Sequence, residues 1–137
     1  MKKLILLCMI IGFALSINAQ VGQVSMTNAN GSTLDTLSNT TAEGCYILLK
    51  GKGIQGLSLT IDMTTITGTV AGKVYLASGA ASGKRGINYL DSAVLSAGSN
   101  AYTFERSVPS GQYYWLWVVP TGTQSTSYRG YAYIRRE

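Results

Sequence analysis

Two runs of alternating aromatic residues near the C-terminus are the side chains best suited to bind a partner. Residues two apart share one face of a β-strand, so each run would form a row of neighbouring side chains. The first row is Tyr113, Trp115 and Trp117, and the second is Arg129, Tyr131 and Tyr133. Aromatic rings flanked by arginine stack on sugar rings or pack against protein surfaces. These six residues are therefore the candidate contacts for a partner or ligand.

Three interpretations of these rows are open. In the favoured one, the Trp row fills a protein core and the Tyr/Arg row is solvated strand surface. In the others, the rows form a subunit interface or contact carbohydrate. If the last two strands pair as a hairpin through residues 120–127, both rows lie along one sheet.

The residues needed for catalysis or metal binding are missing or scattered. The 137 residues include no histidine, which excludes His-dependent triads, imidazole bases and His-ligated metals. Ser82-Gly83-Lys84 lacks the spacing and the following helix of a phosphate-binding loop. No motif selects a catalytic pair or a calcium cluster from the six acids, which are Asp35, Glu43, Asp62, Asp91, Glu105 and Glu137. We predict no catalytic, metal-binding or cofactor-binding residue, and no enzymatic activity.

The N-terminus has the three-part pattern of a secretory signal. Lys2 and Lys3 precede an apolar run over residues 4–15, and a small residue, Ala19, follows. The run is shorter than the ~20 residues of a membrane span, and a short retained anchor is the alternative. We expect cleavage after Ala19 and a location in the periplasm, at the cell surface, outside the cell or in a virion.

The charge of the chain depends partly on this signal. Removing residues 1–19 leaves 118 residues and lowers the formal net charge from +5 to +3, because Lys2 and Lys3 are lost. The remaining close basic residues are isolated pairs such as Lys84 and Arg85, unlike the clustered basic face of a nucleic-acid-binding protein. We expect no nucleic-acid partner. Cys45 becomes the single cysteine and lies in an apolar stretch, which indicates a buried, inert thiol.

The rest of the chain is typical of a single all-β domain. Short stretches of β-branched and aromatic residues alternate with Gly and Ser/Thr turns. Residues 57–63 alternate strictly, which places Leu57, Leu59, Ile61 and Met63 inward and Ser58, Thr60 and Asp62 outward. We expect Asp62 and Glu105 to lie on outward strand faces opposite cations or Thr. Residues 112–119 are apolar on both faces, as in a central strand. The pattern predicts an antiparallel β-sandwich, jelly-roll-like, with seven to nine short strands over residues 33–137.

Residues 20–32 are predicted to form an N-terminal arm. The arm is polar and has little to bury alone, so it could pair with the edge strand of a neighbouring subunit. The low charge of the chain also suits a protein that assembles.

Two stretches resemble a known group of proteins. The first is Ile66-Thr67-Gly68-Thr69-Val70-Ala71-Gly72-Lys73-Val74-Tyr75-Leu76, and the second is Tyr113-Tyr114-Trp115-Leu116-Trp117-Val118-Val119-Pro120-Thr121-Gly122-Thr123-Gln124-Ser125-Thr126. They resemble small, mostly uncharacterised β-sandwich proteins of phages and prophages of Bacteroidota-type bacteria, over roughly residues 33–136. The resemblance implies a β-sandwich with a virion-surface or tail-associated role. The family's loop aspartate is absent from residues 78–89, so no acidic loop site is carried over.

Taken together, the sequence predicts a non-catalytic structural or adhesive module that self-assembles or docks on a larger protein. The alternative is an extracytoplasmic carbohydrate-binding module that uses an aromatic sheet face.

Overall fold

The computed structural model describes residues 21–38, 40–50, 53–79, 88–98, 100–107 and 112–136. The predicted signal segment and the Ser82-Gly83-Lys84 loop lie outside these residues. Within them no helix occurs, so none is long and apolar enough to cross a membrane. The described chain forms ten strands: β1 (Val21–Ser25), β2 (Thr27–Asn28), β3 (Asp35–Ser38), β4 (Glu43–Leu48), β5 (Ile54–Gly68), β6 (Gly72–Gly79), β7 (Asn88–Val94), β8 (Asn100–Arg106), β9 (Tyr113–Pro120) and β10 (Gln124–Arg136).

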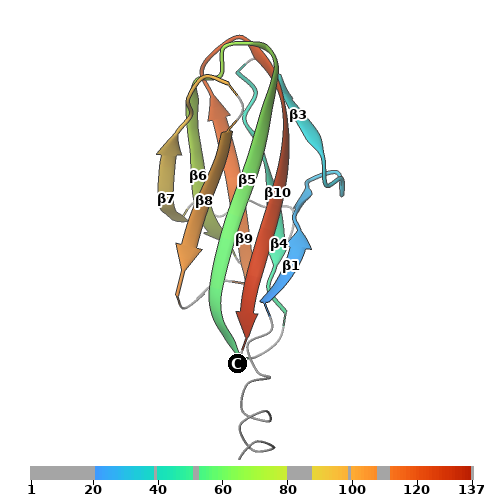
Figure 1. Ribbon diagram of the computed structural model, residues 1–137, viewed down its shortest axis with the longest axis vertical. Coiled ribbons are helices and arrows are strands. Elements are labelled where there is room, and N and C mark those ends of the chain that lie inside the picture. Colours follow the sequence, from blue (N-terminus) through green and yellow to red (C-terminus); the bar gives the residue numbers. More distant parts are fainter. Residues whose placement is uncertain are drawn as a thin grey trace, which may run out of the picture.

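The strands form two antiparallel five-stranded sheets packed face to face, which confirms the predicted β-sandwich (Figure 1). In sheet A the order is β1-β10-β5-β8, and β3 also pairs with β10. In sheet B the order is β2-β4-β9-β6-β7. The ten strands of the described residues exceed the predicted seven to nine because the N-terminal segment supplies two short strands of its own.

Sheet A is built around its two longest strands. β5 has 15 residues and β10 has 13, and they pair along almost their whole length. Their inward residues are buried as the alternation predicts, with Leu59, Ile61 and Ala132 fully inaccessible. The central position of β9 in sheet B is also confirmed, because it lies between β4 and β6. Its inward residues Leu116 and Val118 are fully buried.

The last two strands do not pair as a hairpin, so the condition for both rows to lie along one sheet is not met. β9 belongs to sheet B and β10 to sheet A, so the chain changes sheets between Pro120 and Gln124. β9 is apolar on both sides and is enclosed by β4 and β6, whereas β10 has polar outward residues and matches the long β5. The two candidate rows therefore lie on different sheets.

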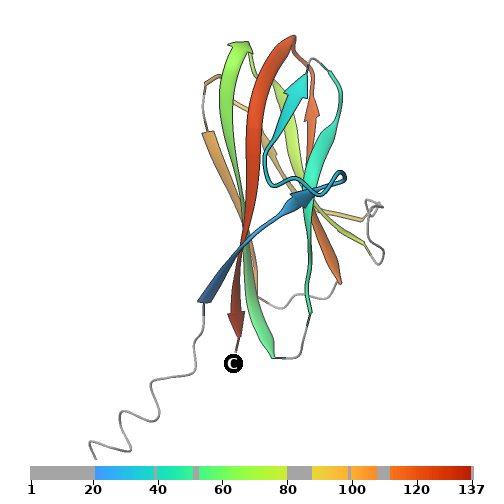
Figure 2. The same cartoon turned by 90° about the vertical axis from the view of Figure 1, so that its right-hand side faces the viewer.

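The N-terminal segment, for which pairing with a neighbouring subunit was one possibility, pairs within its own chain. β1 lies antiparallel to β10 in sheet A, and β2 pairs with β4 in sheet B (Figure 2). Met26 lies between them, is 1% exposed, and donates its backbone N–H to the carbonyl of Gly130 at 2.8 Å. The segment thus joins the two sheets along one edge and buries a methionine as it crosses.

Candidate functional site

The Trp row lies on the outer face of sheet B, and the prediction that it fills the core is wrong. In the register of β4 and β9, Cys45 pairs with Leu116 and Ile47 with Tyr114, and all four side chains are buried in the core. Tyr113, Trp115 and Trp117 alternate with these residues and so point away from sheet A. Because β9 is apolar on both faces, its pattern alone does not decide which face meets the core.

Six aromatic residues from four strands gather on this outer face, which we call the aromatic face. They are Tyr46, Tyr75, Tyr89, Tyr113, Trp115 and Trp117. The ring of Tyr46 packs on that of Trp115, with centroids 4.5 Å apart and an interplanar angle of 34°. Trp115 and Trp117 meet edge to face at 76°, and Tyr75 and Tyr89 lie 4.8 Å apart at 45°. The rings therefore pack on one another at angles and do not form a plane.

Accessibility differs sharply along this row. Trp115 is only 2% exposed although it points away from the core, and its indole N–H has no hydrogen-bond partner among the described residues. Trp117 and Tyr113 are half-buried. Trp117 packs against Gly44 of β4, where a Cβ would approach its ring to 2.9 Å. A partner can therefore reach the rim of the face but not Trp115 beneath Tyr46.

The aromatic face is almost uncharged. Lys73 is the charged side chain that the strand register places on the described part of this face. The exposed large side chains lie at its β7 edge, where Tyr89 is 47% and Val94 is 70% exposed. A face of this kind favours a neutral partner, because a charged one would lose solvation without gaining an opposite charge.

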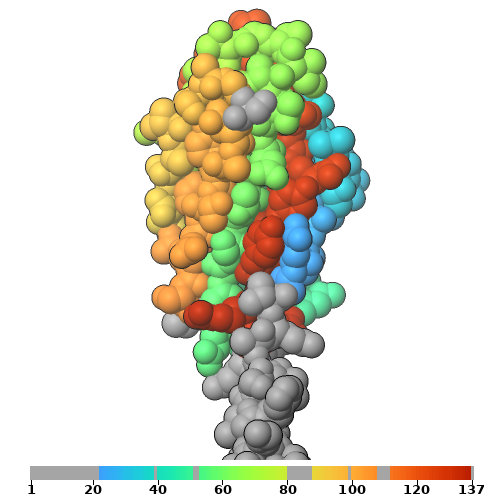
Figure 3. All heavy atoms as spheres, in the orientation of Figure 1, coloured from blue at the N-terminus to red at the C-terminus, as the bar shows by residue number. Residues whose placement is uncertain are grey.

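The second predicted row, Arg129, Tyr131 and Tyr133, lies on the outer face of sheet A together with Arg135. This face is shown in Figure 3, with β8, β5, β10 and β1 side by side. The row is solvent-accessible strand surface, and the side chain of Tyr133 is 37% exposed. Asp62 pairs in register with Arg129, and Glu105 with Ser58, so both acids face outward as expected.

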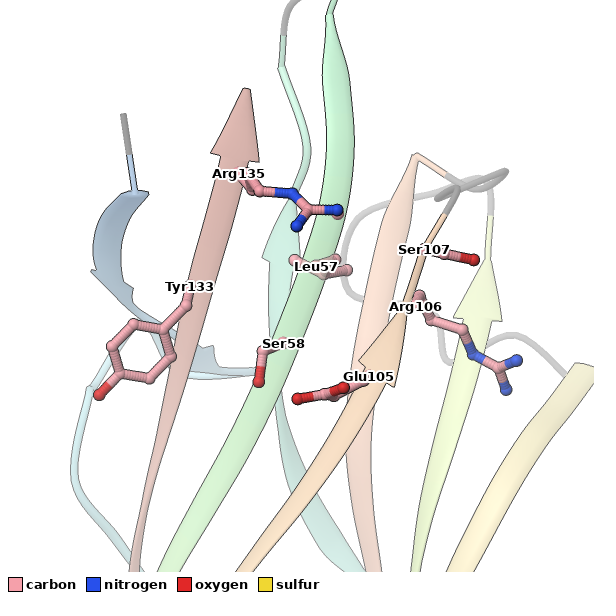
Figure 4. Close-up of a pocket in the computed structure, with 8 residues that line it drawn as sticks. Leu57, Ser58, Glu105, Arg106, Ser107, Tyr133 and Arg135 are labelled. Carbon is pink, nitrogen blue, oxygen red and sulfur yellow. The ribbon is translucent and has the colours of Figure 1, made fainter. Parts of the chain in front are cut away.

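A hollow of about 270 Å³ lies on this outer face, near the C-terminal end of β10 (Figure 4). Figure 4 shows Arg135 extending over β5 from β10 and Glu105 extending toward β5 from β8, with Ser58 between Glu105 and Tyr133. The residues that line the hollow are Gly56, Leu57, Ser58, Glu105, Arg106, Ser107, Tyr133 and Arg135. Of these, only Tyr133 was a candidate contact from the sequence. Strict alternation placed Ser58 and Glu105 outward, but only the register of three strands brings them together.

A polar cluster lies at the edge where β2, β3, β4 and β10 meet. The Asn28 side-chain amide donates to the Asp35 carboxylate, and its oxygen accepts the backbone N–H of Ser32 at 2.8 Å. Burial and the negative charge of Asp35 raise the pKa of the Glu43 carboxyl. Burial, followed by the nearby carboxylates, raises the pKa of Tyr128 well above its usual range. The hydrogen bonds of Asn28 fix the turn between β2 and β3.

The described residues contain no group of three or more metal-ligating side chains of the His, Cys, Asp or Glu type. Cys45, predicted to be a buried inert thiol, is 2% exposed, and burial raises its pKa to about 12. A thiol with this pKa is a poor nucleophile at neutral pH.

No family model matches the chain, and no curated protein matches it. Among solved structures, tripeptidyl peptidase 2 matches with a TM-score of 0.52 and 14% identity, over 84% of this chain and 10% of that chain. A family 29 carbohydrate-binding module complexed with cellulohexaose matches with a TM-score of 0.46 and 11% identity, over 86% and 81% of the two chains. The Yersinia pseudotuberculosis-derived mitogen matches at 0.45 and 9%, over 87% of each chain. At these identities the likeness concerns the fold alone.

Proposed function

We propose that this protein is a non-catalytic structural module that docks on another protein through the aromatic face of sheet B. The observation that carries the proposal is the contrast between the two outer faces of the sandwich. The outer residues of β5 and β10 are mostly Ser, Thr, Asp, Arg and Tyr, as expected for a face in water, with Gly56 opposite Arg135 and one strongly exposed apolar residue, Ile66, near the end of β5. The outer residues of β4, β6 and β9 include five aromatic rings and one charge.

A sheet face that carries this many aromatic side chains and so few charges is a typical sign of an interaction surface. Tyrosine and tryptophan are enriched at the centres of protein interfaces, and charged residues are depleted there. The aromatic face has this composition, with Lys73 as its charged residue. Its partially exposed tyrosines bring a hydroxyl group to each contact and so tolerate water when the partner is absent.

The ring geometry favours a protein over a flat polysaccharide surface. Binding to a flat surface requires rings that lie in one plane, whereas the interplanar angles are 34°, 45°, 53° and 76°. Trp115 is buried beneath Tyr46, so it packs against the Tyr46 ring and does not contact a ligand directly. An uneven, packed aromatic surface suits the interdigitating side chains of a protein partner.

We further propose that the module acts outside the cytoplasm, in an exported or virion assembly. The signal-like residues 1–19 and the resemblance of residues 66–76 and 113–126 to phage-associated sandwiches support this location. A structural instead of a catalytic role is supported by the absence of histidine from the sequence and by the scattered positions of its six acids. The partner is either a second copy of this chain or a larger component of that assembly.

Sedimentation velocity across a concentration series tests docking between copies. Tyr89→Lys places a charge on the exposed edge of the aromatic face and should shift an oligomer to monomer. Tyr133→Lys makes the same substitution on the other outer face and should leave the oligomer unchanged.

If the native protein is a monomer throughout, a photo-crosslinking residue at position 89 in the native assembly tests the larger partner. Crosslinks from position 89 but not from position 133 support the proposal. A monomer that forms no crosslink to protein from position 89 contradicts it.

A further inference from the structure

The hollow on the outer face of sheet A contains hydrogen-bonding groups that nothing in the described chain satisfies. Glu105 supplies a carboxylate, which only accepts hydrogen bonds, and Arg135 supplies a guanidinium, which only donates. Both side chains line the hollow, yet they do not form an ion pair with each other. Neither side chain forms a hydrogen bond with any other described residue. The hydroxyl groups of Ser58 and Tyr133 line the same space and also lack a partner within the described residues.

The backbone beneath Arg135 is shaped to hold its side chain. Gly56 pairs with Arg135 in the β5–β10 register. A Cβ on Gly56 would lie 3.3 Å from Nε and 3.4 Å from Nη2 of that guanidinium. Because Gly56 has no side chain, the guanidinium lies across β5 toward β8 (Figure 4). A guanidinium held in this way loses less conformational freedom when a ligand binds.

A second hollow, of about 210 Å³, lies further along the same two strands. It is lined by Leu34, Asp62, Thr64, Ser127, Tyr128, Arg129 and Tyr131. It repeats the composition of the first hollow, because each contains one outward carboxylate, one outward guanidinium, one outward tyrosine and hydroxyl side chains. Asp62 faces Arg129 in register, and no ion pair joins them in the described structure. Ser58 and Asp62 are four residues apart on β5, or about 13 Å at ~3.3 Å per residue.

We propose that this outer face binds an oligosaccharide that lies along β5 and β10 and contacts both hollows. A sugar hydroxyl group both donates and accepts, so neighbouring hydroxyl groups bridge a carboxylate and a guanidinium that do not pair with each other. The apolar faces of the sugar rings pack against Tyr131 and Tyr133. Each hollow is smaller than the ~300–1,000 Å³ of a pocket for a drug-sized ligand, which fits one sugar unit. The repeated composition fits a ligand with repeating units.

The electrostatics of the two hollows favour a neutral saccharide over a phosphate or a nucleic acid. Each has one outward acid for one outward base. Arg106 also lines the first hollow, but its guanidinium donates to the carbonyl of Leu90 at 2.7 Å. The site is distinct from the aromatic face, on the opposite side of the sandwich, and does not depend on the docking proposed above.

Affinity gel electrophoresis with soluble mannans, glucans and xylans, followed by calorimetry with the matching hexasaccharide, tests the inference. The native protein should bind at least one of these polymers, and the hexasaccharide should bind at least tenfold more tightly than its monosaccharide. Glu105→Gln and Asp62→Asn should each weaken binding about fivefold or more, and the pair should abolish it. Tyr89→Lys, on the aromatic face, should leave the affinity within twofold.

Four results would overturn the proposal. In the first, the folded native protein binds none of the polymers. In the second, the Glu105→Gln/Asp62→Asn variant, shown to be folded by its unfolding temperature, binds as tightly as the native chain. In the third, Trp117→Ala abolishes binding while the carboxylate variants retain it, which would place the ligand on the aromatic face. Displacement of the bound saccharide by millimolar inorganic phosphate would also contradict a site selective for neutral ligands.

Discussion

Gly130 of β10 and Cys45 of β4 face each other across the sandwich with no room for another carbon atom between them. A Cβ on Gly130 would overlap the Cys45 sulfur and would lie 3.1 Å from the Cβ of Met26. All three residues belong to the edge where the N-terminal segment joins the two sheets. The approach of the sheets at this edge therefore depends on a glycine.

Gly130→Ala is expected to destabilise the fold by about 1–3 kcal/mol, the usual range for an added methyl group in a packed core. The reduced entropy of the unfolded chain offsets ~0.4–1 kcal/mol of this loss. Urea denaturation measures the change. Gly22→Ala, where nothing lies within 4 Å of the added carbon, is the matched control and should change stability by less than ~0.5 kcal/mol. Equal effects at both positions would contradict the packing described here.

The Cys45 thiol should resist alkylation in the native protein at pH 8. The thiol is 2% exposed and its pKa is raised to about 12. The alkylating reagent therefore cannot reach the sulfur, and almost none of the reactive thiolate is present. Peptide mapping after iodoacetamide treatment should find Cys45 unmodified in buffer and fully modified in concentrated guanidinium chloride. Rapid modification of the native protein would show that the β2–β4 edge opens.

Stability should fall as the pH rises above about 9. In the unfolded chain the Cys45 thiol loses its proton near its ordinary pKa of 9.0, while in the folded protein burial raises the pKa to about 12 and the thiol keeps its proton. Unfolding then releases a proton, so the free energy of unfolding decreases through this window. The slope from Cys45 approaches ~1.4 kcal/mol per pH unit, and Tyr128, whose pKa is also raised, adds in the same direction at higher pH.

Urea titrations between pH 8 and pH 11 measure this slope. Cys45→Ala should make it shallower whatever its effect on stability at pH 8. An unchanged slope in that variant would rule out Cys45 as its source.

The two tryptophans should differ in their response to a quencher. Trp115 is 2% exposed and Trp117 is half-buried, although both point outward from sheet B. In Trp117→Phe, which retains Trp115, acrylamide should quench the fluorescence several-fold less than in Trp115→Phe, which retains Trp117. Equal quenching would show that Tyr46 does not cover Trp115.

The alternation of single strands could be predicted from the sequence, but the neighbours of each strand could not. Leu57, Leu59, Ile61 and Met63 are buried as predicted, because a two-residue period separates the faces of a half-buried strand. β9 has large apolar residues on both faces, so its pattern is compatible with either orientation. Its placement depends on the pairing with β4 and β6, which bury Leu116 and Val118.

The candidate site on sheet A also depends on strand neighbours that the sequence does not predict. The aromatic and basic row of β10 is visible in the sequence because its members are two residues apart. Glu105 and Ser58 join that row from β8 and β5, which are far away in the chain. Their meeting depends on the strand order of sheet A and on a register that no local pattern encodes. Gly56, which makes room for Arg135, reads in the sequence as an ordinary turn glycine.

The pairing of β1 with β10 has a consequence for how the chain is made. Val21 lies opposite Arg135, so the first described strand completes its edge of sheet A only with the last (Figure 1). β10 is also the partner of β5 and β3, so sheet A lacks its centre until the 13 residues of β10 are available. A nascent chain on the ribosome therefore cannot complete the sandwich before β10 has been synthesised and has left the ribosome. Any product truncated before β10 exposes the core, so the sandwich folds as a single unit once β10 is available.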